Sequence, residues 1–451
     1  MKRLKTFKFG GIHPKGEKLT AGFPIQSLPL PKRVILSVAQ HIGTAATVVV
    51  KEGDLVKTGT VIARLEGVVS SNIHSSVSGQ VVKIDESIDV SGYKIKSIEI
   101  ETKGDLWEDS INLNQPIPDF ETFSAAEILH KIREAGIVGM GGAGFPTHVK
   151  LEIPAGMQAD TLLINGVECE PYLTSDHRLM LEKGVEILTG TSLIMKVLKV
   201  QRAIIGIEIN KPDAILLLKK LAKGHKGIEV EALEMKYPQG SEKQLIQALT
   251  GRQVASGALP ASVGVIVNNV GTAYAVYEAI VKNKPLIERV VTVTGKGLKN
   301  PGNFLVRIGT PVRTLIEAAG GLPENTGKVI IGGPMMGRAI STLDIPVTKG
   351  MSGIVVMPKE EAFRQTVLPC IRCAKCVDGC PMILEPYLLM LLAENGKWEQ
   401  AESNHVTDCI ECGSCSFACP SARPILDYIR TGKSTVGKII RSRQNATKTN
   451  V

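Results

Sequence analysis

Hydrophobic positions in the middle of the chain change repeatedly between two spacings. From residue 161 onward, apolar runs of strand length alternate with stretches that carry apolar residues at helical spacing. We expect strands at 161–164, 203–209, 228–233 and 263–267, and helices from Asp176, over 212–222 and over 242–249. Alternation at this length predicts a mostly parallel sheet with helices on both faces.

A further helix is predicted ahead of this region. Ser124 and Glu127 form the pattern of a capping box in front of an apolar run that begins at Ile128. Gly136 is the residue type that ends such a helix. The Pro- and Asp-rich stretch 114–119 before the cap is predicted to be a linker.

Two shorter patterns follow towards the C-terminus. The stretch 290–294 followed by 307–321 has the pattern of a strand, a turn and a helix, which predicts a smaller α+β unit. Near the end, Tyr387, Leu388 and Leu391 recur at helical spacing, which predicts a helical module there.

Residues 44–83 carry short β segments separated by tight-turn residues such as Gly53 and Gly79. The pattern resembles the barrel-sandwich fold of biotinyl and lipoyl carrier domains. A carrier needs a lysine on the hairpin between its two halves, and no lysine occurs between Thr58 and Val82. We therefore expect this domain to be structural or a docking surface rather than a swinging arm.

Length and composition describe a multidomain α/β protein. A chain of 451 residues is too long for one core and predicts three or four domains. Its hydrophobic share of 43% and its 45 glycines are those of an ordinary globular protein. No apolar run is long enough to span a bilayer, and the first residues do not read as a signal peptide.

The net charge is +9, and the segment after Arg430 is basic without any acidic residue. Its cations are Lys433, Lys438, Arg441, Arg443 and Lys448. Such a tail suits anionic lipid or an acidic partner, although a solvated, frayed terminus is the commoner explanation. Aromatic residues are not interleaved with these cations, so nucleic acid is a poor candidate partner.

Eight of the nine cysteines form two copies of one motif. The copies are Cys370-x2-Cys373-x2-Cys376-x3-Cys380-Pro381 and Cys409-x2-Cys412-x2-Cys415-x3-Cys419-Pro420. This is the bacterial ferredoxin spacing, in which the fourth cysteine of each copy ligates the other [4Fe–4S] cluster. Zinc is the alternative, but a zinc site favours two plus two ligands separated by a loop.

The crossed pattern divides the cysteines into two ligand sets. One cluster is expected on Cys370, Cys373, Cys376 and Cys419, and the other on Cys409, Cys412, Cys415 and Cys380. Because these ligands must be thiolates, we expect a reducing location on the cytoplasmic side of a membrane. The ninth cysteine, Cys169, is expected to be a buried small residue.

A glycine-rich loop and two later segments are candidate binding residues. Gly139, Gly141, Gly142 and Gly144 formally match G-x-G-x-x-G, but a helix precedes them and Pro146 follows, so a plain turn is the alternative. The next strand leads to acidic and amide side chains at the C-terminal edge of the sheet, where α/β folds bind ligands. These side chains are Asn165, Glu168 and Glu170.

The later segments are weaker when taken alone. The stretch from Tyr237 through Gly240 opens a helix, so its backbone N–H groups can meet an anion or a carbonyl. Asn268 and Asn269 close a strand, where paired asparagines more often satisfy local backbone than bind a ligand.

Taken together, these segments resemble the flavin- and NADH-binding subunit of respiratory complex I, a family that binds FMN non-covalently. Further motifs in the same order make the chain similar, nearly end to end, to the RnfC family of the Rnf electron-transport complexes. They are Gly10, Gly11, His13, Pro14, His41, the stretch 73–79, the stretch 332–337 and the two cysteine runs. The complex I family has an arginine where Met140 stands and an aspartate where Val167 stands, so its flavin contacts are not all reproduced.

The resemblance implies roles for particular residues, with no catalytic side chain among them. The cofactor loop is implied at Gly139, Gly141, Gly142, Gly144 and Lys150, and further FMN contacts at Asn165, Glu168, Tyr237, Gly240, Asn268 and Asn269. Contacts with NADH are implied for Phe145, Glu170 and Glu242.

The resemblance also implies the domain order. We expect a barrel-sandwich hybrid over 1–113, a Rossmann-like α/β domain for FMN and NADH over 120–284, and a β-grasp domain of the SLBB type over 285–357. A helical ferredoxin-like domain with two [4Fe–4S] clusters would follow over 358–436, and then the basic tail over 437–451.

The function implied is that of a peripheral member of a ferredoxin:NAD+ oxidoreductase complex that moves Na+ or H+. Hydride would pass between NAD(H) and FMN, and single electrons would pass through the two clusters to or from other Rnf subunits, with ferredoxin an indirect partner. Those subunits would hold the chain at the cytoplasmic side of the inner membrane. A soluble flavin and Fe–S enzyme of the cobalamin-reductase type and a non-catalytic electron relay stay open as alternatives, although domain order disfavours the first.

Overall fold

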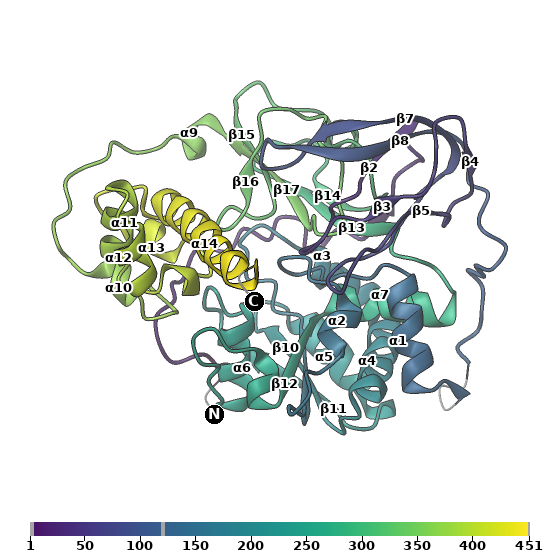
Figure 1. The fold of residues 1–451 in the computed structure, drawn as a ribbon, viewed down its shortest axis with the longest axis horizontal. Coiled ribbons are helices and arrows are strands. Elements are labelled where there is room, and N and C mark those ends of the chain that lie inside the picture. The colour runs from purple at the N-terminus through teal and green to yellow at the C-terminus, as the bar shows by residue number, and fades with distance from the viewer. Residues whose placement is uncertain (1–3, 119–121, 450–451) are drawn as a thin grey trace. The chain divides into compact units, whose positions relative to one another are not determined.

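The computed structural model describes residues 4–118 and 122–449, and the chain divides into two compact units (Figure 1). The smaller unit comprises Met1–Lys15, Glu234–Leu259 and Phe363–Val451. The larger unit comprises Gly16–Leu233 and Pro260–Ala362. Asp119 of the predicted linker lies outside the described residues, as do residues 450 and 451 of the predicted tail.

The N-terminal part of the larger unit is a pair of small antiparallel sheets. One sheet has the order β2–β8–β7–β4 and the other β3–β5–β6. Their bounds are β2 Arg33–Ser37, β3 Thr47–Val48, β4 Leu55–Val56, β5 Val61–Arg64, β6 Ile73–His74, β7 Ser78–Ile88 and β8 Lys94–Gly104. Alternate residues such as Val34, Leu36, Ile98 and Ile100 point into the shared core, as the period of a strand requires.

The segment on either side of β6, at the return end of the hairpin that would carry a lysine in a carrier domain, is fixed inside the larger unit. The buried Lys349 ammonium donates to the carbonyl oxygens of Asn72 and Gly136, at 2.7 Å each. The Ser76 hydroxyl donates to the carbonyl of Ile308 at 2.5 Å, and Arg307 donates to the carbonyl of Ser76 at 2.8 Å. Three parts of the larger unit therefore meet beside β6.

The central sheet of the larger unit is fully parallel, with the order β11–β10–β9–β12. Its strands are β9 Thr161–Asn165, β10 Ala203–Glu208, β11 Ile228–Leu233 and β12 Val265–Asn269. The predicted parallel sheet is confirmed. The fourth strand begins two residues later than predicted because Pro260–Val263 forms a 3-10 turn.

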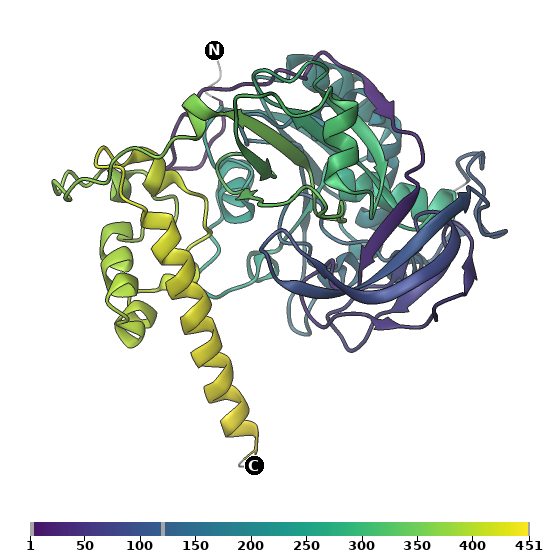
Figure 2. The same cartoon turned by 90° about the horizontal axis from the view of Figure 1, so that it is seen from above.

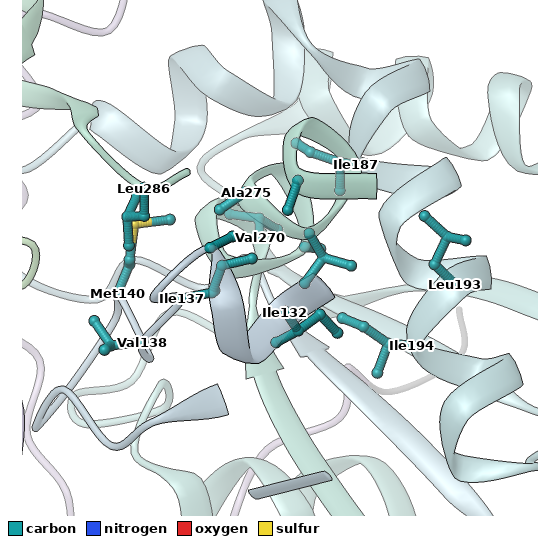
Figure 3. Close-up of a cluster of buried hydrophobic side chains, with 14 of the residues drawn as sticks. Ile132, Ile137, Val138, Met140, Ile187, Leu193, Ile194, Val270, Ala275 and Leu286 are labelled. Carbon is teal, nitrogen blue, oxygen red and sulfur yellow. The ribbon is translucent and has the colours of Figure 1, made fainter. Parts of the chain in front are cut away.

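Helices accompany this sheet as the alternating pattern predicted. They are α1 Ala125–Glu134, α2 Thr147–Leu151, α3 Ser175–Glu182, α4 Gly184–Leu198, α5 Pro212–Leu221 and α7 Val270–Val281. The capping box of Ser124 and Glu127 is present at the start of α1. Figure 3 shows Ile132 of α1, Ile187 of α4 and Val270 of α7 in one buried apolar cluster.

Close packing of α4 on α7 depends on a glycine. A Cβ added to Gly190 of α4 would stand 1.8 Å from the carbonyl oxygen of Ala273 in α7. The two helix backbones therefore approach more closely than any side chain at this position would permit.

A mixed six-stranded sheet completes the larger unit, in the order β1–β14–β13–β17–β15–β16. Its elements are β1 Ile25–Ser27, β13 Glu288–Thr294, β14 Gly302–Arg307, α8 Val312–Ala318, β15 Thr326–Ile331, β16 Arg338–Ala339, β17 Gly353–Pro358 and α9 Lys359–Ala362. Strand β1 pairs in parallel with β14. The N-terminal segment thus supplies an edge strand to a sheet that the sequence placed entirely within 285–357.

The smaller unit is mainly helical. Its helices are α6 Glu242–Thr250, α10 Lys375–Asp378, α11 Pro386–Glu394, α12 Trp398–Ser403, α13 Ser414–Ala418 and α14 Ile425–Thr449. The core contains Leu389 and Met390 of α11 with Ile425, Ile429 and Val436 of α14. None of the helices in the described ranges is long and apolar enough to cross a membrane.

The expectation of a frayed basic terminus is wrong for the described part of the tail. Figure 2 shows α14 as one continuous helix, which ends at Thr449. Lys433 donates to the carbonyl of Cys409 at 2.6 Å, and Arg443 pairs with Glu402 at 2.9 Å. These contacts and apolar residues at helical spacing pack α14 against the other helices of the smaller unit. The charge pattern alone did not predict this packing.

Candidate functional site

The predicted cofactor edge lies where the strand order of the parallel sheet reverses. From β9 the chain proceeds outward through β10 and β11, and β12 then returns to the opposite side of β9. In open α/β sheets ligands bind outside the carboxyl ends of strands at such a reversal. Asn165 ends β9, Asn269 ends β12, and these two residues are paired in register.

The glycine-rich loop closes onto this edge. The N–H of Gly139 donates to the carbonyl of Phe145 at 2.9 Å, which makes the loop a tight hairpin. The N–H of Met140 donates to the hydroxyl of Thr272 in α7 at 3.1 Å. A Cβ on Gly141 would stand 2.6 Å from the amide nitrogen of Asn269, whereas a Cβ on Gly142 would meet no atom within 4 Å. The loop is therefore packed at Gly141 and open at Gly142.

The two asparagines at the end of β12 are placed differently. The side-chain oxygen of Asn269 accepts a hydrogen bond from the N–H of Gly271 at 2.7 Å and so caps α7. Its amide nitrogen donates to Asp176 at 2.7 Å and to the carbonyl of Asn165 at 3.3 Å. The side-chain nitrogen of Asn268 is buried and has no hydrogen-bond partner among the described residues. A buried donor without a partner is costly, so an acceptor on a ligand or a water would stabilise Asn268.

Glu168 is engaged within the larger unit. Its backbone has a φ of +46°, and its carboxylate accepts from the N–H groups of Asp176 at 2.8 Å and His177 at 3.2 Å. The carboxylate therefore sits at the N-terminus of α3, where a negative charge is stabilised. The prediction placed this side chain on FMN, and no structural observation tests that role.

Lys18 organises the segment between β9 and α3, and sequence reasoning missed it. Its buried ammonium donates to the carbonyl oxygens of Glu168 at 2.8 Å, Glu170 at 2.9 Å and Leu173 at 2.6 Å. Burial, followed by repulsion from Lys211, lowers the pKa of Lys18 to about 8. Nothing local in the sequence identifies it, because its partners lie 150 to 155 residues away.

Glu170 meets a second glycine-containing loop. Its carboxylate accepts from the N–H of Met335 at 3.0 Å and of Met336 at 2.8 Å. A Cβ on Gly333 would stand 2.2 Å from a Glu170 oxygen, so this glycine permits the approach. Burial raises the pKa of Glu170, and the two N–H donors oppose that rise.

Asp176 is a further acidic group at this edge that sequence reasoning treated only as the start of a helix. Burial and then the Glu168 carboxylate raise the pKa of Asp176 to about 7, while the Asn269 amide acts in the opposite direction. Asp176 also lines a cavity of about 40 Å³ with Met140, Tyr274 and Arg289. A cavity of that size has room for two or three waters, each of which needs about 10–15 Å³.

Three of the predicted contacts belong to the smaller unit. Tyr237 and Gly240 precede α6, and Glu242 is its first residue. Tyr237 is buried, and its hydroxyl donates to the carbonyl of Cys412 at 2.8 Å. The structure thus brings Tyr237 to the second cysteine motif.

Four cysteines line one cavity in the smaller unit. They are Cys380 of the first motif and Cys409, Cys412 and Cys415 of the second. Burial raises the pKa of Cys409 to about 11, and the pKa of Cys412 and Cys415 also rises. Backbone N–H groups of Leu384 and Glu411 donate to the sulfurs of Cys380 and Cys409, both at 3.4 Å. Such N–H donors stabilise a metal-bound thiolate.

The remaining four cysteines of the motifs are more accessible. Cys370 and Cys373 are exposed, and Cys376 and Cys419 are partly buried. The charge of Cys419 contributes to the raised pKa of Cys376, although burial is the larger cause. In the described ranges no three His, Cys, Asp or Glu side chains lie close enough to share one ion, whereas each cysteine of a [4Fe–4S] cluster binds a different iron. Eight thiols, four of which line one cavity, fit two clusters as a donor set.

Comparison with protein families divides the chain in the expected order. Residues 5–105 match the RnfC barrel sandwich hybrid domain and residues 132–278 the Nuo51 FMN-binding domain. Residues 290–339 match the SLBB domain and residues 369–422 a 4Fe-4S dicluster domain.

Curated relatives extend over almost the whole chain. The C subunit of the proton-translocating ferredoxin:NAD(+) oxidoreductase complex of Clostridium ljungdahlii is 47% identical over 434 residues, which cover 96% of this chain and 94% of the relative. Its counterpart in the Na(+)-translocating complex of Acetobacterium woodii is 45% identical over 433 residues, which cover 96% and 97%. The chain belongs to the RnfC family. The family prediction and the predicted fold class are therefore confirmed.

A solved structure supports the fold of this RnfC family member. A chain of the NAD+-reducing [NiFe]-hydrogenase in the H2-reduced state matches 69% of this chain with a TM-score of 0.51 at 19% identity. The match spans 63% of the hydrogenase chain, and at this identity it speaks for the fold alone. The FMN-binding and dicluster matches support the expected cofactors, FMN and [4Fe–4S] clusters.

Proposed function

We propose that this protein exchanges electrons between NAD(H), FMN and two [4Fe–4S] clusters within an Rnf-type ferredoxin:NAD+ oxidoreductase that moves Na+ or H+. The observation that carries the proposal is the switch-point edge, where the glycine loop meets Asn165 and Asn269, in a chain that also holds two ferredoxin motifs. The proposed membership of such a complex is based on the names of the relatives. We place the protein on the cytoplasmic side of the inner membrane, held there by other subunits.

The FMN site is proposed on the glycine loop and the strand ends. In the larger unit the contacts are Gly139, Gly141, Gly142, Gly144, Lys150, Asn165, Glu168, Asn268 and Asn269. Tyr237 and Gly240 are proposed as contacts from the family resemblance alone. Gly142 leaves space for a flat ring or a phosphate to approach the backbone. Asn268 supplies a buried N–H donor, which a cofactor oxygen would satisfy.

The nicotinamide nucleotide is proposed to contact Phe145, Glu170 and Glu242. Glu170 accepts two backbone N–H groups, and each carboxylate oxygen retains further acceptor capacity for a ribose hydroxyl. FMN held at this site would supply the link between two-electron hydride chemistry and one-electron transfer. The protein residues bind, orient and exclude water, and no side-chain acid or base is assigned to the hydride step.

The two clusters are proposed to use crossed ligands. Cys409, Cys412, Cys415 and Cys380 would hold one cluster, and Cys370, Cys373, Cys376 and Cys419 the other. The cavity lined by the first of these two sets supports the crossed arrangement, since it contains one cysteine from the first motif and three from the second.

Anaerobic purification followed by NADH titration tests the function. We expect stoichiometric flavin, iron for two clusters, bleaching of the flavin absorbance on addition of NADH, and EPR signals from reduced clusters. Iron without flavin, together with spectra that do not respond to NADH, would instead identify an electron relay that does not bind nucleotide.

A further inference from the structure

The two cysteine sets differ in their surroundings within the smaller unit. The set with Cys412 is enclosed: Cys380, Cys412 and Cys415 are 7–9% exposed, and the set lines an internal cavity. The set with Cys370 is open, because Cys370 and Cys373 are exposed to solvent. The two proposed clusters would therefore differ in how accessible they are to solvent and to other proteins.

Segments outside the cysteine motifs, which contain Gly10, Tyr237 and Gln244, pack around the enclosed set. The Tyr237 hydroxyl donates to the carbonyl of Cys412 at 2.8 Å, and Gln244 of α6 donates to the carbonyl of Pro381 at 3.0 Å. A Cβ on Gly10 would stand 2.3 Å from the carbonyl oxygen of Cys380. The enclosed set is thus packed against the segment that carries the proposed flavin contacts Tyr237 and Gly240.

Exposed apolar side chains lie close in sequence to two cysteines of the open set, Cys370 and Cys419. Val367, Leu368 and Ile371, which precede or follow Cys370, are 54%, 53% and 67% exposed. Phe417, two residues before Cys419, is 56% exposed. The N–H of Leu368 donates to the carbonyl of Ser421 at 3.0 Å, which holds the two segments together. We call Val367, Leu368, Ile371 and Phe417 the cysteine face.

Cations accompany the cysteine face. Arg372 and Lys375 are exposed on the same segment, with Asp378 as the nearby carboxylate. Arg364, at the start of the segment, is already paired with Asp427 at 2.8 Å. Exposed apolar residues with a polar, mainly basic rim are typical of a protein interaction site.

We propose that the cysteine face docks a protein partner that carries a one-electron redox centre surrounded by apolar and acidic side chains. The proposal rests on the proposed function, because the open set must then hold the cluster that exchanges electrons with the rest of the complex. A [4Fe–4S] cluster takes or gives one electron, so the partner centre changes by one electron in the opposite sense and no proton or bond is transferred.

The chemistry of the face favours a redox protein over other occupants. In a complex, apolar contacts around Cys370 would exclude water from this proposed ligand. Arg372 and Lys375 would increase the association rate of an acidic partner. Electron-transfer encounters need only a small interface, below about 1,200 Å² in total. A patch of four apolar residues and two cations is suited to that size.

The test uses the chain assembled in its complex, with Ile371→Ser combined with Phe417→Ser. The control is Leu216→Ser, since Leu216 is 71% exposed on α5 of the larger unit. Rapid-freeze EPR follows NADH-driven reduction of centres on the other subunits. We expect at least a tenfold slower transfer, or loss of the chain from the purified complex, for the double variant and neither effect for the control.

Further measurements separate the alternatives. Flavin bleaching by NADH and the EPR signals of the chain itself should be unchanged in the double variant, and their absence in the parent protein would refute the proposed function rather than the docking face. Arg372→Gln with Lys375→Gln should reduce the dependence of the transfer rate on ionic strength. Unchanged transfer in the double variant would overturn the proposal. So would loss of binding to phosphatidylglycerol vesicles with transfer intact, which would assign the face to lipid.

Discussion

The hydroxyl of Tyr237 donates a hydrogen bond to the carbonyl oxygen of Cys412 at 2.8 Å, and both residues belong to the smaller unit. Tyr237 is 2% exposed, so this contact is shielded from water. A residue of the proposed flavin site therefore touches the backbone of a proposed cluster ligand, and the two sites cannot be perturbed independently at this point.

Tyr237→Phe should alter the enclosed cluster and leave the open cluster unchanged. Loss of the hydroxyl leaves a buried carbonyl with one donor fewer, which costs about 1–3 kcal/mol of unfolding free energy. It also removes the positive end of a dipole near Cys412, so the reduction potential of that cluster should fall. Redox titration followed by EPR measures the shift. Tyr93→Phe, at a residue that is 72% exposed in the larger unit, should shift neither potential.

Single cysteine replacements should reveal the crossed ligation. Cys380→Ser should damage the cluster of the second motif, and Cys419→Ser the cluster of the first motif. EPR of the reduced variants identifies which signal survives when each is compared with Cys412→Ser and Cys373→Ser. If Cys380→Ser removes the same signal as Cys373→Ser, each motif holds its own cluster and the crossed assignment fails.

Gly142→Ala should weaken FMN binding without destabilising the fold. An added Cβ meets no protein atom within 4 Å, so the free energy of unfolding should change by less than about 0.5 kcal/mol. The methyl group would occupy space that the cofactor is proposed to use. Fluorescence titration of the flavin-free protein with FMN measures the affinity. Gly22→Ala, which is equally free of contacts, should bind FMN as the parent does.

Glu170→Gln should loosen the loop at Met335 and Met336. An amide can offer only one oxygen, so one of the two N–H groups that Glu170 binds loses its acceptor, at a cost of about 1.5–3 kcal/mol for a bond to a charged group. Hydrogen exchange at these amides should accelerate, and the Kd for NADH should rise. Glu324→Gln, at an exposed position, is the control. Faster exchange with unchanged NADH affinity would make Glu170 a structural residue only.

Asp176 should make stability depend on pH. Its pKa rises from 3.8 to about 7 on folding, so the folded protein holds a proton that the unfolded chain has lost in this window. The associated stability is complete below about pH 4 and is lost as pH rises through about 7, with a slope of at most about 1.4 kcal/mol per pH unit. The groups that face Asp176 are Glu168, Asn269, Arg289 and Lys211.

Asp176→Asn removes this titration while its carbonyl oxygen can still accept from Asn269. Denaturant unfolding at pH 5 and pH 8 measures the difference between variant and parent. We expect the variant to lose less stability than the parent between the two pH values. An identical pH dependence in both proteins would show that Asp176 is ionised throughout this range.

Local patterns predicted the elements well, and long-range contacts account for the differences. The strand at 228–233 and the capping box at Ser124 have the predicted positions, because each depends on neighbouring residues. Lys18 and Asp176 were not recognised as part of the site, since their roles depend on partners far along the chain. The family resemblance named the residues of the edge, but not that the carboxylates of Glu168 and Glu170 already accept backbone N–H groups.

Lys349 ties the segment beside β6 to the rest of the larger unit, which limits how the chain can be divided into fragments. Its ammonium joins Asn72 in the N-terminal sheets to Gly136 beside the glycine loop, and Arg307 and Ile308 hold Ser76 from the other side. A fragment that starts after the linker would leave Lys349 without the carbonyl of Asn72. It would also remove Val34 and Ile98 from the buried cluster that they share with Ile137. The barrel-sandwich domain therefore contributes to the stability of the larger unit. We expect the flavin-binding segment to fold only when it is produced together with that domain.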